Sequence, residues 1–152
     1  LPLGALLASL RRAGLTGILA HVERNQGVLA QPAAAEALVE AGCLLQVTAG
    51  SVTGTFGPEV EKLAHWLIER RLVHFIATDA HGARSRRPQM RRAFERVTGL
   101  AGYDVACAIC CRNPAAVVND ELIEPAAAKP ATGRPTGRRS GWGRWFGWNK
   151  AG

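Results

Sequence analysis

Apolar residues recur along the chain with two different spacings, and each spacing predicts a different element. In residues 58–71 they recur every three or four positions, as on one face of an amphipathic helix. Pro58 suits the first helical turn, where its missing N–H has no bonding partner to lose. Glu59 and Glu61 lie in the first turn, and Arg70 and Arg71 lie in the last turn. This order of charges complements the helix dipole. We therefore predict a helix with one buried face over residues 58–71.

Shorter apolar runs alternate with further helical patterns over the first 120 residues. The predicted strands are residues 17–22, 43–49 and 72–80. The other predicted helices are residues 2–13, 32–41, 88–98, 102–111 and a short one over 114–120. Residues 50–57 are rich in Gly, Ser and Thr and read as a loop. This alternation predicts the α/β class, with about three parallel strands forming a buried sheet that helices cover.

The composition changes at Glu124. Residues 1–124 hold 13 Lys and Arg against 12 Asp and Glu, a net charge of +1, whereas residues 125–152 hold six bases and no acid. The overall charge of +7 therefore belongs mainly to the tail, which argues against a folded body that binds nucleic acid. We predict a folded domain over residues 1–124 and a flexible basic tail over residues 125–152.

The tail carries aromatic residues among its arginines. They are Trp142, Trp145, Phe146 and Trp148. Such a mixture suits a membrane interface or an anionic polymer, and it also suits a solubilising tail that binds nothing specific. Both interpretations stay open.

Cysteine usage and hydropathy point to the cytoplasm. The four cysteines have no regular disulfide spacing, and no apolar run is long enough to cross a bilayer. Cys107, Cys110 and Cys111 form a C-x-x-C-C group without a second ligand pair nearby, so reduced thiols are favoured over a zinc site. We expect a cytoplasmic protein, with membrane association only through the tail.

Candidate metal ligands follow two of the predicted strands. Asp79 and His81 are two positions apart, so in extended backbone they point to the same side. A carboxylate and an imidazole are a partial ligand set for a divalent metal, although Asp79 could equally cap a turn beside an exposed His81. His21 ends a different strand. Because functional groups gather at the carboxyl ends of parallel strands, we expect the three side chains to converge.

Arginines stand next to these candidate ligands. Arg24 follows His21, and Arg84, Arg86 and Arg87 follow His81. Arginine can bind a phosphate through two parallel hydrogen bonds, which indicates a phosphoester substrate. Most arginines of residues 84–96 fit a solvated helix face, whereas Arg24 and Arg86 are the candidate phosphate-binding residues.

Three segments, AHVERN, LLQVTAGSVTGTFG and HFIATDAHGARSRRP, resemble in order and spacing a known family. It is the PHP-type (polymerase and histidinol phosphatase) protein-tyrosine phosphatases of capsule and exopolysaccharide operons, the CpsB/CapC type. The resemblance runs from about residue 2 to about residue 120. The DAH motif is common to many PHP proteins, whereas the QVTAGS-x-TG-x-FG stretch is more specific to the phosphatase branch.

The resemblance implies a distorted β/α barrel with a cluster of metal ions, usually Mn²⁺, at its carboxyl-terminal rim. It implies that His21, Asp79 and His81 are metal ligands and that Arg24 and Arg86 bind phosphate and are catalytic. Glu23 belongs to the same motif, but we expect it to pair locally rather than to bind metal. Water activated by the metals would attack phosphorus directly, without a covalent enzyme intermediate.

The chain also departs from the family pattern. Val22 replaces a proline, and Gly82 stands where asparagine is common. The family's H-x-H motif and further ligands should lie upstream of Leu1, so we expect a partial barrel with weak or no activity alone. The implied function is removal of phosphate from a tyrosine autokinase that regulates capsule synthesis. The alternatives are a phosphoesterase for a metabolite such as histidinol phosphate, or a degenerate remnant that binds a partner or membrane through its tail.

Overall fold

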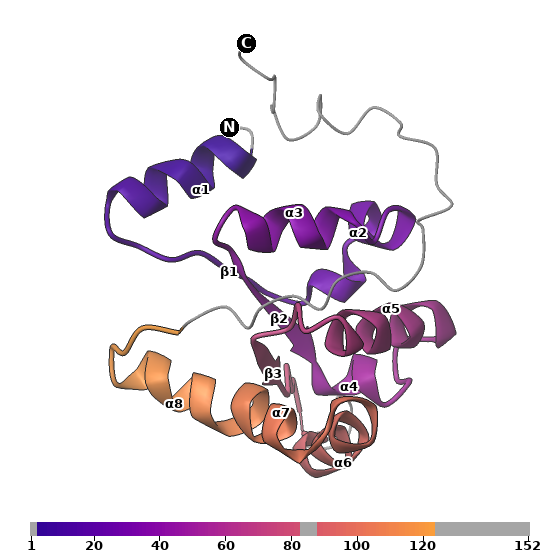
Figure 1. Ribbon diagram of the computed structural model, residues 1–152. Coiled ribbons are helices and arrows are strands. Elements are labelled where there is room, and N and C mark those ends of the chain that lie inside the picture. Colours follow the sequence, from indigo (N-terminus) through magenta and orange to yellow (C-terminus); the bar gives the residue numbers. More distant parts are fainter. Residues whose placement is uncertain (1–2, 83–87, 124–152) are drawn as a thin grey trace.

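Three parallel strands form the centre of the computed structural model, which describes residues 3–82 and 88–123. The strands are β1 (Ile18–Leu19), β2 (Leu44–Thr48) and β3 (Phe75–Ala77), and β2 lies between the other two (Figure 1). Leu19 pairs with Leu45 and Val47 pairs with Ile76. The predicted α/β class with three parallel strands is therefore confirmed.

Helices connect and cover the strands, as parallel pairing requires. Helix α1 (Leu3–Arg12) precedes β1, and a 3-10 turn, η1 (Val22–Arg24), follows it. The remaining elements are α2 (Gln26–Ala30), α3 (Ala34–Glu40), α4 (Ala49–Val52), α5 (Pro58–Glu69), α6 (Met90–Ala101), α7 (Tyr103–Cys107), the π-helical turn η2 (Ala108–Arg112) and α8 (Asn113–Val118). Figure 1 shows α2 and α3 on one side of the strands and α6, α7 and α8 on the other.

The observed elements differ from the predicted ones mainly at their ends. The strand predicted over residues 72–80 is regular only at Phe75–Ala77, and the loop predicted over residues 50–57 contains most of α4. Helix α2 was not predicted. It begins because the side chain of Asn25 accepts hydrogen bonds from the N–H groups of Gly27 and Val28, at 2.9 and 3.3 Å.

The hydrophobic core surrounds β2. Leu45 and Val47 of this strand are fully buried, as are Leu67 of α5 and Val97 of α6. A strand that is buried on both faces reads as a continuous apolar run, which is why residues 43–49 show no alternation. Both faces of β2 are therefore covered, and Leu67 of α5 and Val97 of α6 belong to the core that surrounds this strand.

His74 links β2 to the segment that enters β3. It is buried, and the backbone N–H of Leu45 donates to its Nδ1 at 3.1 Å. Because Nδ1 accepts this bond, the proton of the neutral ring sits on Nε2. Burial is the main cause that lowers the pKa of His74 below its usual value. His74 is therefore a structural residue.

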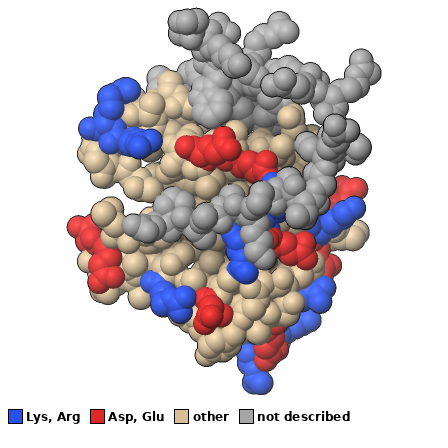
Figure 2. Space-filling view, in the orientation of Figure 1, with Lys and Arg blue, Asp and Glu red and all other residues tan. Residues whose placement is uncertain are grey.

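Charges of both signs are distributed over the surface. Figure 2 shows separate groups of basic and acidic side chains on the face in view. Charged side chains of opposite sign also pair, as in the bond that Arg70 donates to Glu36; Arg70 ends α5 and Glu36 lies in α3. This agrees with the near-neutral charge of residues 1–124. Among the described residues, none of the helices is both long and apolar enough to cross a membrane.

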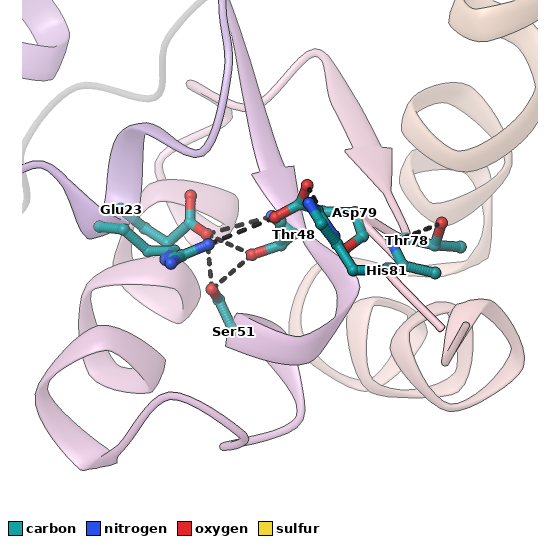
Figure 3. A network of polar contacts seen from close by, with 8 residues as sticks. Glu23, Thr48, Ser51, Thr78, Asp79 and His81 are labelled. Carbon is teal, nitrogen blue, oxygen red and sulfur yellow. Dashed lines mark hydrogen bonds and ion pairs between the residues drawn. The ribbon is translucent and has the colours of Figure 1, made fainter. Parts of the chain in front are cut away.

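A buried carboxylate ties η1 to the carboxyl end of β2. Glu23 is fully buried, and its Oε1 accepts from the N–H and the hydroxyl of Thr48 at 3.1 and 2.6 Å (Figure 3). The hydroxyl of Ser51 donates to the same oxygen at 2.5 Å. A buried polar group is costly without hydrogen bonds, and Oε1 has three donors, whereas Oε2 is buried without a partner among the described residues. These contacts fix η1 against β2 and α4, and we call them the Glu23 cluster.

We expect acidification to destabilise the protein through His74. The unfolded chain takes up a proton near pH 6.5, whereas the native state resists it because the pKa of His74 is lowered. The free energy of unfolding should therefore fall as the pH decreases below about 6.5, by up to about 1.4 kcal/mol per pH unit from this residue. His74→Asn keeps an acceptor for Leu45 but cannot titrate, and urea unfolding from pH 7.5 to 5 should show a shallower slope. An unchanged slope in this variant, or an equal reduction in the control His65→Gln, contradicts the assignment.

We expect the Glu23 cluster to contribute strongly to stability. Glu23→Ala removes the acceptor of three buried donors and leaves a cavity, so the free energy of unfolding should fall by about 2–4 kcal/mol. Urea unfolding at neutral pH measures the loss. Glu59→Ala is the control, because Glu59 is exposed in the first turn of α5 and its loss should cost less than about 1 kcal/mol. Equal losses in the two variants would show that the cluster adds nothing beyond a surface carboxylate.

Candidate active site

Four of the five site residues predicted from the sequence lie around one pocket. His21, Arg24, Asp79 and His81 line a pocket of about 340 Å³, although 55 residues separate Arg24 from Asp79. His21 and Arg24 follow β1, whereas Asp79 and His81 follow β3. The carboxyl ends of two parallel strands thus bring the groups together, as the strand-end rule predicts. Arg86, the fifth residue, lies outside the described residues.

The backbone turns sharply at both edges of the pocket. His21 has a φ of 40° and Asp79 a φ of 46°, in the left-handed region that residues other than glycine adopt rarely. Such strain costs on the order of 1–3 kcal/mol per residue and is often found at functional sites. Each turn comes two residues after the end of a strand, β1 or β3. The side chains therefore leave the sheet and face the pocket.

Asp79 and His81 come together in a different way from the one predicted. Alternation along a strand cannot align them, because β3 ends at Ala77 and Asp79 adopts a left-handed conformation. Instead, Nδ1 of His81 lies 2.7 Å from the carbonyl oxygen of Asp79 and 3.8 Å from its carboxylate Oδ1. A carbonyl oxygen only accepts, so Nδ1 carries the proton. The lone pair of Nε2 is then available to an electrophile, an arrangement typical of ligand histidines.

Arg24 crosses the pocket. Its Nη1 donates to Oδ2 of Asp79 at 3.3 Å, and the two side chains are 34% and 24% exposed. Such a partly exposed ion pair adds little to stability. A guanidinium has five N–H donors, so this bond leaves others that could bind an anion. The carbon at the centre of the guanidinium also lies 4.3 Å from the centroid of the Phe56 ring.

The residues of the pocket have the right chemistry for a metal but do not complete a site. Imidazole nitrogen and carboxylate oxygen suit Zn²⁺, Mn²⁺ or Fe²⁺. Within residues 3–82 and 88–123, however, no three His, Cys, Asp or Glu side chains are grouped closely enough to hold one ion. The described part of the chain therefore offers donors for a metal centre without forming a whole one.

Other titratable residues do not contribute to the pocket as the structure describes it. Nε2 of His65 lies 3.0 Å from the carbonyl oxygen of Val52, a contact that joins α5 to α4. Burial, with Cys111 and Cys107 nearby, raises the pKa of Cys110 to about 12, so this thiol stays protonated at neutral pH. The interpretation of the C-x-x-C-C group as reduced thiols agrees with this environment.

Sequence reasoning missed two kinds of supporting residue. Residues 50–57 were predicted to be a plain loop, but the N–H of Thr48, just before this segment, is bonded to Glu23. Thr48 and Ser51 are instead buried partners of that carboxylate, so Glu23 pairs with a neighbouring strand end. The signal in the sequence that pointed to Glu23 was its position next to Arg24, a predicted site residue. Phe56 was missed because a lone aromatic residue in a glycine-rich segment has no periodicity.

The chain is similar to a known family and to known proteins. Residues 3–119 match the family described as capsular polysaccharide synthesis, CpsB/CapC. The tyrosine-protein phosphatase YwqE of Bacillus subtilis (strain 168) is 37% identical over 81 residues, which cover 53% of this chain and 32% of that protein. The tyrosine-protein phosphatase CpsB of Streptococcus pneumoniae is 30% identical over 122 residues, covering 77% of this chain and 50% of that protein.

The fold is also similar to a solved structure. A chain from the crystal structures of YwqE from B. subtilis and CpsB from S. pneumoniae, described as metal-dependent tyrosine phosphatases, matches with a TM-score of 0.80 and 27% identity. The match covers 85% of this chain and 52% of that one. The present chain thus spans about a third to a half of the length of these relatives. With 117 consecutive positions matched and the fold shared, the chain belongs to the CpsB/CapC family of capsular polysaccharide synthesis.

Proposed function

We propose that this chain provides one side of the active site of a metal-dependent protein-tyrosine phosphatase. The observation that carries the proposal is the convergence of His21, Arg24, Asp79 and His81 on one pocket. Two imidazoles, a carboxylate and a guanidinium suit the cleavage of a phosphate ester. In this proposal the three strands are part of a PHP-type distorted β/α barrel, and the pocket lies at its carboxyl-terminal rim.

Each residue has a separate task in the proposed reaction. Arg24 exchanges its bond to Asp79 for bonds to the phosphate oxygens, and Arg86 provides a second guanidinium. His21, Asp79 and His81 would contribute ligands to a metal centre, and the metals, proposed to be Mn²⁺, would activate water and neutralise charge on the phosphate. The proton that Nδ1 of His81 donates to Asp79 fixes its ring orientation.

The proposed substrate is phosphotyrosine on a bacterial tyrosine autokinase that regulates capsule or exopolysaccharide synthesis. Two findings support this choice: the relatives are named tyrosine-protein phosphatases, and the family is described by capsular polysaccharide synthesis. A cytoplasmic location fits such a substrate, and binding of the tail to a membrane surface is part of the proposal. A small metabolite such as histidinol phosphate has no specific observation in its favour.

A second candidate is a remnant that retains the fold without catalysis. One observation favours it: in the described segments, no three metal donors come together, and the carboxylate of Asp79 is bonded to Arg24. Such a protein would act by binding a partner or a membrane. The two candidates differ in whether the pocket binds a metal ion.

The phosphatase proposal predicts that Mn²⁺ binds through Asp79. Titration of the full chain, followed by the paramagnetic resonance signal of free Mn²⁺, should show binding that Asp79→Asn weakens at least about tenfold. Asp104→Asn is the matched control, because Asp104 is exposed on α7 and is not among the residues that line the pocket. Equal affinity for Mn²⁺ in the Asp79 variant and in the control would favour the remnant.

The proposal also predicts that O-phosphotyrosine binds through Arg24. Loss of hydrogen bonds to a charged group costs roughly 1.5–3 kcal/mol, so Arg24→Gln should weaken binding by about 10- to 100-fold. Nuclear magnetic resonance titration of the full chain measures the affinity, with unphosphorylated tyrosine as the ligand control. Arg112→Gln, which changes an exposed arginine bonded to the carbonyl oxygen of Asp104, should have no effect. Binding that is insensitive to Arg24, or equally strong for tyrosine, contradicts the proposed phosphate site.

A further inference from the structure

Arg24 has an aromatic neighbour in the segment that follows α4. The centre of its guanidinium lies 4.3 Å from the centroid of the Phe56 ring, within the range of a cation–π interaction. Phe56 is half-buried and is not among the described residues that line the pocket. Among the described residues, Arg24 is the pocket residue that Phe56 is seen to contact.

The ring of Phe56 is held in place by its own surroundings. A Cβ built on Gly50 would lie 2.9 Å from Cε2 of Phe56, so the ring rests directly against the backbone of α4. The preceding turn is anchored to Gln89 ahead of α6. Thr53 donates to the side-chain oxygen of Gln89 at 2.8 Å, and the amide of Gln89 donates to the hydroxyl of Thr55 at 3.1 Å. The ring is therefore a fixed surface.

Arg24 itself has a long side chain that would otherwise sample many rotamers. Its bond to Asp79 cannot hold it during phosphate binding, because the proposed reaction exchanges that bond for bonds to phosphate. The contact with Phe56 uses the face of the guanidinium system, whereas hydrogen bonds use its N–H edge. Both can therefore exist at once, as the bond from Nη1 to Asp79 already shows.

We propose that Phe56 is a positioning residue that holds the guanidinium of Arg24 toward the pocket and so preorganises it for phosphate. The inference rests on the proposed function, because it assigns Phe56 a role in the phosphate binding attributed to Arg24. A side chain that is already ordered loses less entropy on binding, which raises affinity without a new contact to the ligand.

The test is the affinity of the full chain for inorganic phosphate, measured by nuclear magnetic resonance titration. Phe56→Leu keeps an apolar side chain but removes the aromatic face, and it should weaken phosphate binding about two- to fivefold. Phe56→Tyr restores the face and should bind phosphate as the unsubstituted chain does. Phe94→Leu is the control, since Phe94 is also half-buried and packs edge-on against Tyr103 of α7, with 5.7 Å between ring centroids.

Two further measurements separate positioning from a general effect on the fold. The Nε–H resonance of Arg24 should carry a ring-current shift that disappears in Phe56→Leu and persists in Phe56→Tyr. In an Arg24→Gln background, Phe56→Leu should not weaken phosphate binding any further. Equal weakening in both backgrounds, equal weakening by Phe94→Leu, or no effect of Phe56→Leu overturns the inference.

Failure of the proposed function gives a different result. If the unsubstituted chain does not bind phosphate although the ring-current shift of Arg24 is present, phosphate binding by this pocket is refuted and the inference falls with it. If the chain binds phosphate through Arg24 and substitution of Phe56 does not change the affinity for phosphate, the inference alone is wrong.

Discussion

The pocket depends on a carboxylate that does not line it. Glu23 is fully buried, and one of its oxygens collects three donors from Thr48 and Ser51. Because a buried polar group is costly without hydrogen-bond partners, the three bonds to Oε1 hold η1 where β2 ends and α4 begins. His21 and Arg24 flank Glu23, so they take their positions from this requirement. The buried interaction thus determines where the exposed chemistry is.

Strain at the pocket is tolerated because rigid structure adjoins it. His21 and Asp79 both have left-handed backbone, which is unfavourable for side chains with a Cβ. His21 is followed by η1, which contains the buried Glu23. Asp79 is preceded by β3, in which Phe75 and Ile76 are buried. These anchors prevent the backbone from relaxing to a more favourable conformation. Strain of this kind is typical of sites where the direction of a side chain matters more than local stability.

The sequence predicts the order of the elements, and which residues come together at the pocket, better than it predicts the orientation of those residues. Residues 58–71 were predictable because periodicity, Pro58 and the charges all favour one helix. The strand-end rule predicted that Arg24 and Asp79 lie at the same edge of the sheet, and there they contact each other. The alternation argument for Asp79 and His81 was wrong, because a short strand cannot be distinguished from a long one by its apolar residues alone.

The supporting residues were less accessible to sequence reasoning. Arg24 and Phe56 lie in segments that share no periodicity, so residue spacing does not predict their contact. The position of the Phe56 ring also requires a glycine at position 50, because a Cβ there would lie 2.9 Å from Cε2 of the ring. In the sequence, a loop explains that glycine equally well. The partners of Glu23 lie 25 and 28 residues away, across a helical crossover. Contacts of this kind depend on tertiary packing. They become visible only when the strands are placed side by side.

Strand order has a consequence for the size of the pocket. His21 follows β1 and Asp79 follows β3, so the central strand β2 separates the two edges. Two strand spacings amount to roughly 9–10 Å. Arg24 is long enough to reach across this distance, whereas the described imidazole and carboxylate groups do not close on one point. The one intervening strand therefore sets the distance between the two edges of the pocket that a bound group must span. This distance does not depend on the side chains at the rim.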